Sequence, residues 1–323
     1  MTRVLTGVQS TGVPHLGNLL GAIIPAINMA NNGENESFLF IADLHSLTSI
    51  KDGETLSNNT YGVAAAWLAF GLDPSKTVFY RQSDVPETTE LAWYLMCHFQ
   101  YQRLTLAHSF KDKAGRTSDI NAGLFNYPML MAADILLYDA NEVPVGKDQL
   151  QHIEMTRDVA QKLNTSTGKE LLVIPEAIIQ EDTTLIPGTD GGKMSKSRNN
   201  YINIFLSDKA LRKQVMKIET DSTPMEDPKD PETCNVFTLY KLLGTDAEIQ
   251  ALAEKYRAGN FGYGHAKQAL YELILEKFKT EREKFNYFIN NKDEIDTILS
   301  EGAEKARKIA HKTLYRVRRE LGY

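Results

Sequence analysis

Short apolar runs alternate with longer amphipathic segments through the first half of the chain. The runs are rich in Val, Ile, Leu and Phe, a pattern that is typical of strands buried on both faces. The segments between them place apolar residues at helical spacing and end near Gly or Pro. The pattern predicts strands at residues 4–8, 37–42, 77–80 and 142–145, and helices at 16–30, 56–70, 87–99 and 149–163.

Strands that alternate with helices in this way indicate an α/β fold with a doubly wound, Rossmann-like parallel sheet, whose ligands bind at the carboxyl ends of the strands. After Asp208 the β-branched runs disappear, and the second half predicts an all-helical C-terminal domain. The boundary between the two domains lies between Gly188 and Leu206. We expect helices at 209–219, 236–243, 247–258, 267–288 and 293–321, with loops at 186–203 and 220–231.

Composition narrows the possible functions. A net charge of −6 over 323 residues disfavours nonspecific binding along a nucleic-acid backbone, although a local basic face is still possible. The chain has no apolar stretch of about 20 residues and no secretory pattern at its start, so we expect a cytoplasmic protein with no membrane or DNA partner. Cys97 and Cys234 lie far apart, which predicts neither a disulfide framework nor a metal site formed by the protein.

Two segments carry candidate chemistry, and the first spans residues 7–18. It lies where the first strand ends and the first helix begins, so backbone N–H groups and the helix dipole favour a phosphate there. Gly17 lets a nucleotide approach the backbone because it has no Cβ. His15 and Asn18 can donate hydrogen bonds to phosphate oxygens. The alternative is a glycine-rich turn with a surface histidine, and this segment alone does not decide between them.

The second segment, residues 191–197, reads Gly-Gly-Lys-Met-Ser-Lys-Ser. Two lysines behind two glycines predict a mobile cationic loop that closes over a polyphosphate and stabilises it as the phosphates separate. The alternative is a solvated Lys- and Ser-rich loop. However, Lys-Met-Ser-Lys-Ser is the signature of class I aminoacyl-tRNA synthetases, and residues 15–18, His-Leu-Gly-Asn, resemble the companion His-Ile-Gly-His motif of that class.

Within that class, the chain resembles the tryptophanyl-tRNA synthetase family over nearly its whole length. The similar segments are residues 7–12, 41–47, 82–87, 127–138, 143–149 and 301–306. Asn18 replaces the last histidine of the class motif, as it does in this family generally. Lys147 stands where the family often has an acid, which leaves the role of its side chain open.

The resemblance implies a reaction in two steps. L-Tryptophan reacts with ATP to give tryptophanyl-adenylate and pyrophosphate, and tryptophan then passes to the 3′-terminal ribose of tRNA(Trp). ATP is a substrate, Mg²⁺ is implied by ATP chemistry without an assigned protein ligand cluster, and a homodimer is expected. Residues 1–188 would form the Rossmann-like catalytic domain for ATP and tryptophan, 189–204 the mobile lysine loop and linker, and 205–323 the helical domain that binds the tRNA anticodon.

The resemblance also implies roles for single residues. Catalytic roles fall to His15, Asn18, Lys193 and Lys196. Contacts to ATP fall to Gln9, Ser10, Thr11, Gly17, Asn18, Gly146, Lys147, Asp148, Ile186, Lys193, Met194, Ser195, Lys196 and Ser197. Contacts to tryptophan fall to Asp134, Met131, Tyr127, Gln149, Val143 and Val145. Asp148 is also well placed to cap the helix at 149–163, and the two roles are compatible.

The residue types support the assignment of Asp134. Tyr127, Met131 and Asp134 lie at helical spacing and share one face. A carboxylate among apolar residues needs a donor, and an indole N–H is a donor only. A structural ion pair with a nearby Lys or Arg is the alternative. For the apolar residues of the set, simple core packing is the alternative, and His45 either borders the pocket or is a satisfied core histidine.

The last predicted helix is basic, which offers a face for tRNA phosphate, although most charge runs are only solvated. Its charges are Lys305, Arg307, Lys308, Lys312, Arg316, Arg318 and Arg319 against Glu301, Glu304 and Glu320, with Tyr315 among them as a possible stacking group. Three rival functions stay open at this point. They are a tyrosine-specific synthetase, a small-molecule nucleotidyltransferase with a similar histidine turn, and a non-catalytic relative that binds RNA or nucleotide.

Overall fold

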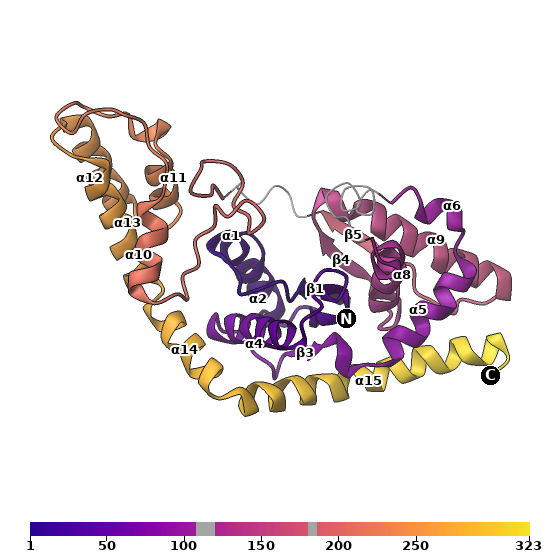
Figure 1. Ribbon diagram of the computed structural model, residues 1–323. Helices are drawn as coiled ribbons and strands as arrows, with labels where there is room; N and C mark the ends of the chain where they lie inside the picture. The colour runs from indigo at the N-terminus through magenta and orange to yellow at the C-terminus, as the bar shows by residue number, and fades with distance from the viewer. Residues whose placement is uncertain (108–119, 180–185) are drawn as a thin grey trace.

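The computed structural model describes residues 1–107, 120–179 and 186–323 (Figure 1). The described strands form a five-stranded parallel sheet in the order β3-β2-β1-β4-β5. They are β1 (Arg3–Gln9), β2 (Glu36–Ala42), β3 (Thr77–Arg81), β4 (Glu142–Val145) and β5 (Glu176–Ile179). The predicted α/β parallel-sheet fold with a helical C-terminal part is confirmed.

The strand order reverses between β1 and β4. From β1 the chain moves outward through β2 and β3, and it then returns to the other side of β1 to form β4 and β5. β1 pairs with β2 along its whole length, whereas it pairs with β4 only at Val4↔Glu142. Beyond that pair the two strands separate, and a crevice opens at their carboxyl ends. This is the switch point at which doubly wound sheets bind ligands.

Helices cover both faces of the sheet, as the apolar strands require. Alternate residues of β2 point to opposite sides: Leu39 and Ile41 join one apolar core, and Phe38 and Phe40 join the other. The first core contains residues of α2 (Ile24–Asn31) and α4 (Gly53–Ala69). The second contains residues of α5 (Glu87–His98), α8 (Ala122–Leu136) and α9 (Leu150–Thr167) (Figure 1).

The C-terminal part is helical and ends with a helix that returns to the sheet. Its helices are α10 (Asp208–Met216), α11 (Asn235–Lys241), α12 (Asp246–Ala258), α13 (Tyr263–Lys277), α14 (Lys279–Asn290) and α15 (Lys292–Leu321). α15 runs back along the α/β part (Figure 1), and its small face, Ala303, Ala306 and Ala310, joins the second core. At Gly302 an added Cβ would lie 1.7 Å from the carbonyl oxygen of Phe79, so only glycine fits this contact with β3.

Three local features were not predicted. The helix expected at 16–30 contains a π-helical segment, η1 (Leu19–Ile23), between α1 (Leu16–Asn18) and α2. Pro25 supplies the reason, because it has no N–H and its ring crowds the carbonyl of Gly21. The helix expected at 267–288 divides at Phe278, which is buried and packs on Phe70. The strand β5 was not predicted; it has only four residues, and most of them are exposed.

The division at 1–188, 189–204 and 205–323 stays a prediction, although the packing of α15 on β3 and α5 joins the last part of the chain to the first. Among the described helices, none combines the length and apolar character needed to cross a bilayer.

Candidate functional site

A cavity of about 320 Å³ opens at the switch point between β1 and β4. Each strand contributes its carboxyl end, with Gln9 from β1 and Val145 from β4. All six residues predicted to contact tryptophan line this cavity: Tyr127, Met131, Asp134, Val143, Val145 and Gln149. The structure therefore brings together side chains from α8, β4 and the segment that follows β4. Their contacts to a substrate stay a prediction.

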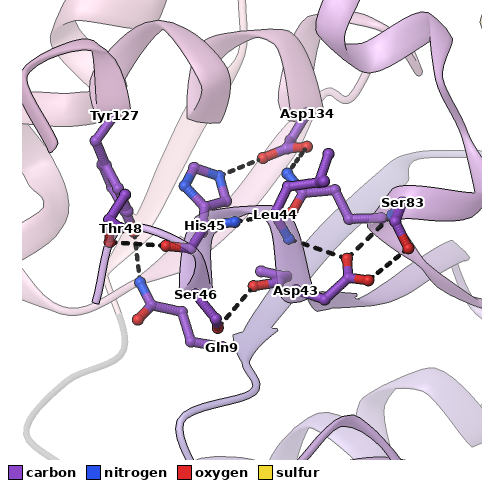
Figure 2. A network of polar contacts seen from close by, with 11 residues as sticks. Gln9, Asp43, Leu44, His45, Ser46, Thr48, Ser83, Tyr127 and Asp134 are labelled. Atoms are coloured by element: carbon purple, nitrogen blue, oxygen red, sulfur yellow. Dashed lines mark hydrogen bonds and ion pairs between the residues drawn. The ribbon is translucent and has the colours of Figure 1, made fainter. Parts of the chain in front are cut away.

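Asp134 is the charged centre of the cavity and is 2% exposed. One carboxylate oxygen accepts a hydrogen bond from Gln82 Nε2 at 2.7 Å, and the other lies 2.7 Å from His45 Nε2. Figure 2 shows the contact between His45 and Asp134. Burial raises the pKa of the Asp134 carboxyl, and the hydrogen bonds from His45 and Gln82 oppose that rise. The expected alternative partner, a Lys or Arg, is not the one found; the partners are an imidazole and an amide.

His45 belongs to α3 (Asp43–Ser46), which directly follows β2, and it is 3% exposed. The ring of Tyr127 packs against it with a centroid separation of 4.3 Å. The hydroxyl of Tyr127 accepts a hydrogen bond from Gln9 Nε2 at 2.9 Å (Figure 2). His45 is thus both buried and part of the cavity lining. Sequence analysis left it undecided and gave no role to Gln82, because no local pattern links either residue to Asp134.

The first motif forms a capped turn. His15 Nδ1 accepts a hydrogen bond from the Asn18 backbone N–H, and Asn18 Oδ1 accepts one from the His15 N–H, both at 3.2 Å. With Nδ1 occupied as an acceptor, the ring proton lies on Nε2. Burial, together with the charge of Lys196, lowers the pKa of His15 to about 4. His15 is therefore a neutral donor near pH 7, and the nearby positive charge belongs to lysine.

The second motif packs directly on the first. Met194 is buried, and its sulfur accepts the Gly17 N–H at 3.2 Å. A Cβ at Gly17 would lie 3.2 Å from the His15 ring and 3.3 Å from Met194 Cβ, so this glycine makes room for the contact between the two motifs. Lys196 Nζ lies 3.5 Å from the carbonyl oxygen of Thr11. Burial lowers the pKa of Lys196 to about 8.

A buried asparagine that sequence analysis did not single out organises the lysine loop. Asn200 is 2% exposed; its Oδ1 accepts the Ser195 N–H at 2.7 Å, and its Nδ2 donates to the Lys193 carbonyl at 3.0 Å. The hydroxyls of Ser195 and Ser197 lie 2.8 Å apart. The side chain of Lys193 is exposed, and in the described residues it has no hydrogen bond or ion pair to the first motif.

The other predicted ATP residues differ in exposure. Gly146, Lys147 and Asp148 are exposed after β4, and Thr11 is exposed after β1, whereas Ser10 is buried against the Ser46 hydroxyl. The Ile186 carbonyl accepts the Met194 N–H at 3.0 Å. The interpretation of Asp148 as a helix cap was wrong. Residues Lys147–Gln149 form a short 3₁₀ turn before α9, and the Asp148 carboxylate accepts from Gln149 Nε2 instead.

The basic run on α15 is largely engaged within the chain. Arg307 pairs with Glu87 at 3.2 Å and Arg318 with Glu90 at 3.5 Å, so both hold α15 against α5. Arg316 donates to the Leu171 carbonyl and pairs with Asp139. Tyr315 is 64% exposed, with Arg319 over its ring. Much of this charge secures the helix to the α/β part.

A parallel sheet with a cavity at its switch point is the arrangement found in α/β nucleotide-binding folds. The family model described as "tRNA synthetases class I (W and Y)" matches residues 1–279. A tryptophan–tRNA ligase of Fusobacterium nucleatum is 48% identical over 322 residues, which cover 100% of this chain and 98% of that protein. The chain therefore belongs to the class I tRNA synthetases, within the tryptophanyl-tRNA synthetase family.

Solved structures agree with this placement. The crystal structure of tryptophanyl-tRNA synthetase from Campylobacter jejuni, complexed with ADP and tryptophan, is 46% identical, covers 100% of both chains and has a TM-score of 0.96. A tyrosyl-tRNA synthetase from Archaeoglobus fulgidus, with L-tyrosine, is 19% identical and has a TM-score of 0.63 over 88% of this chain and 90% of that one. The second likeness shows the shared fold alone.

Proposed function

We propose that this chain activates L-tryptophan with ATP and then charges tRNA(Trp). The observation that carries the substrate assignment is the buried Asp134 carboxylate in an otherwise largely apolar cavity. Each of its oxygens has accepted one hydrogen bond and keeps capacity for another. An indole N–H supplies that bond, whereas a phenyl ring leaves the capacity unused and a phenol also needs a donor. The relative from Campylobacter jejuni was solved with tryptophan.

The chemistry needs no protein nucleophile. The tryptophan carboxylate attacks the α-phosphorus of ATP, the bond to the bridging oxygen breaks, and pyrophosphate leaves. His15 Nε2–H, the Asn18 amide and the Lys193 and Lys196 ammonium groups would stabilise the charge on the phosphates. Gly146 and Asp148 would contact the ribose. A terminal hydroxyl of tRNA then attacks the carbonyl carbon, and AMP leaves.

Mg²⁺ would enter with the ATP phosphates, because it keeps waters and few protein ligands. In the part of the chain that the structure describes, no group of three or more His, Cys, Asp or Glu side chains gathers to hold a metal ion. We therefore assign no step to a protein-bound metal.

The family resemblance supports three further proposals: a homodimer, a cytoplasmic location, and no membrane or DNA partner. If sedimentation finds only monomer at micromolar concentration, the homodimer proposal is wrong.

ATP–pyrophosphate exchange with tryptophan, tyrosine and phenylalanine, each supplied separately, tests the proposed function. Exchange with tryptophan alone supports it. Exchange with tyrosine would mean that the cavity selects a phenol, and exchange with none of the three would favour the non-catalytic alternative.

A further inference from the structure

Gln82 connects the substrate cavity to a segment that the mechanism above does not use. It lies in η2 (Gln82–Asp84), immediately after β3, and is 1% exposed. Its amide nitrogen donates to Asp134 Oδ1 at 2.7 Å, and its amide oxygen accepts the His45 backbone N–H at 3.4 Å. Gln82 thus connects Asp134, which carries the charge, to His45, the other residue that contacts the Asp134 carboxylate.

Asp134 has room for a third donor. Each of its oxygens accepts one hydrogen bond within the chain and has the capacity to accept a second. Since the carboxylate is buried, a further donor from a ligand is favourable.

The backbone around Gln82 is fixed from two sides. The Ser83 N–H donates to Asp43 Oδ1 at 3.0 Å, and the Ser83 hydroxyl donates to Oδ2 of the same residue at 2.5 Å (Figure 2). Arg81 pairs with Asp84 at 2.9 Å and with Asp296 of α15 at 2.9 Å. The backbone that carries Gln82 therefore cannot shift without disturbing both α3 and α15.

We propose that Gln82 is a positioning residue which, together with His45, fixes the Asp134 carboxylate as an acceptor and thereby makes the cavity select an aromatic ring that donates an N–H. This inference rests on the proposed function, in which Asp134 receives the indole. It adds two residues for which the resemblance assigned no substrate role. Both act through Asp134 and need not touch the substrate.

The proposal predicts a pH dependence, since only the ionised carboxylate accepts at both oxygens. The titratable groups around Asp134 are His45 and Asp43 from α3, Tyr80 from β3, Tyr127 from α8, and Tyr138. The pKa values of the three tyrosines are raised above 10, so their hydroxyl groups stay neutral between pH 5 and 8.5. Asp43 raises the pKa of Asp134, and the two donors lower it. Removing the Gln82 donor moves the pKa of Asp134 upward.

The test compares two variants of the full chain in ATP–pyrophosphate exchange between pH 5 and 8.5. Gln82→Met keeps the length of the side chain but removes the donor. Val85→Ala is the matched control, because Val85 is fully buried in the same segment and lies in the apolar core. In Gln82→Met we expect the acid limb of kcat/KM for tryptophan to move up by about one pH unit and KM to rise about tenfold, with kcat changed less. In Val85→Ala we expect the wild-type limb.

A second measurement on the wild-type protein removes any dependence on the folding of a variant. The benzothiophene analogue of tryptophan carries sulfur in place of the indole N–H. As the pH falls, kcat/KM for tryptophan should decrease, whereas competitive inhibition by this analogue should not weaken.

The outcomes separate the two claims. If wild-type protein shows no exchange with tryptophan, the proposed function fails. Two other results would leave the function standing and overturn the role of Gln82. One is that wild type exchanges with tryptophan while a folded Gln82→Met keeps the wild-type acid limb of kcat/KM. The other is that inhibition by the analogue weakens at the same acid pH as kcat/KM for tryptophan.

Discussion

The cavity at the switch point, for which we propose contacts to tryptophan, and the two motif loops beside it, for which we propose contacts to phosphate, are built in opposite ways. In the cavity, Asp134, His45 and Gln82 are each at most 3% exposed, and every carboxylate oxygen already has a partner. In the loops, Asn18 and Lys193 are exposed, and Lys196 Nζ lies 3.5 Å from the carbonyl oxygen of Thr11. A cavity that is organised before its ligand arrives suits discrimination. Exposed side chains on these loops suit groups that become fully engaged only on phosphate in the transition state.

The sharpest way to break this contrast is Asp134→Asn. The asparagine amide places its NH₂ group opposite either His45 Nε2 or Gln82 Nε2. Two buried donors then face each other where a hydrogen bond was. We expect kcat/KM for tryptophan to fall by about 10³-fold in pyrophosphate exchange, with KM for ATP nearly unchanged. A loss shared equally between the two substrates would mean that Asp134 supports the fold and not the indole.

Lys196→Ala tests the loop side. We expect kcat for adenylate formation to fall by about 10²-fold, because one charged donor to the departing pyrophosphate is removed. Single-turnover measurement of adenylate formation gives this rate directly. The exposed Lys209→Ala on α10 serves as the control, since it removes a lysine outside both motifs.

Gly302→Ala tests the support behind the cavity. The new Cβ would meet the Phe79 carbonyl at 1.7 Å, and α15 would have to move from β3, the strand that leads into Gln82. We expect the free energy of unfolding to fall by about 2 kcal/mol in urea titration. Gly264→Ala on α13, where an added Cβ meets nothing within 4 Å, should be neutral or stabilising. Equal effects in the two variants would contradict the packing described for α15.

The smallest expected effect is a fall in kcat/KM for ATP at alkaline pH, caused by the titration of Lys196. The pKa of Lys196 is lowered to about 8, so the free protein loses this charge as the pH rises through 8. We expect kcat/KM for ATP to fall several-fold between pH 7 and 9. In Lys196→Arg the limb should disappear, because arginine stays charged. His15, whose pKa is about 4, is neutral throughout this range and contributes no limb.

The sequence predicted what is local or periodic. The apolar runs placed β1 to β4 within a residue or two. The phosphate contacts expected of the two motifs stay a prediction. Position within α8 also placed Tyr127, Met131 and Asp134 on one face. The strand β5 was missed, because it is only four residues long and mostly exposed.

What sequence analysis did not find depends on contacts between distant segments. Nothing near His45 or Gln82 in the sequence shows that both face Asp134 from other elements. The cap expected at Asp148 failed because a 3₁₀ turn delays the start of α9. Nor did sequence analysis show that Arg307, Arg316 and Arg318 of α15 have acidic partners within the chain. A tRNA-binding face on α15 stays a prediction.

The most direct test of the central claim is equilibrium binding of tryptophan in the absence of ATP, measured by calorimetry on wild type, Asp134→Asn and Lys196→Ala. An organised cavity predicts that Lys196→Ala binds tryptophan with the wild-type Kd, while Asp134→Asn loses at least a hundredfold. If Lys196→Ala weakened tryptophan binding as much as Asp134→Asn, the separation between the cavity and the loops would be contradicted.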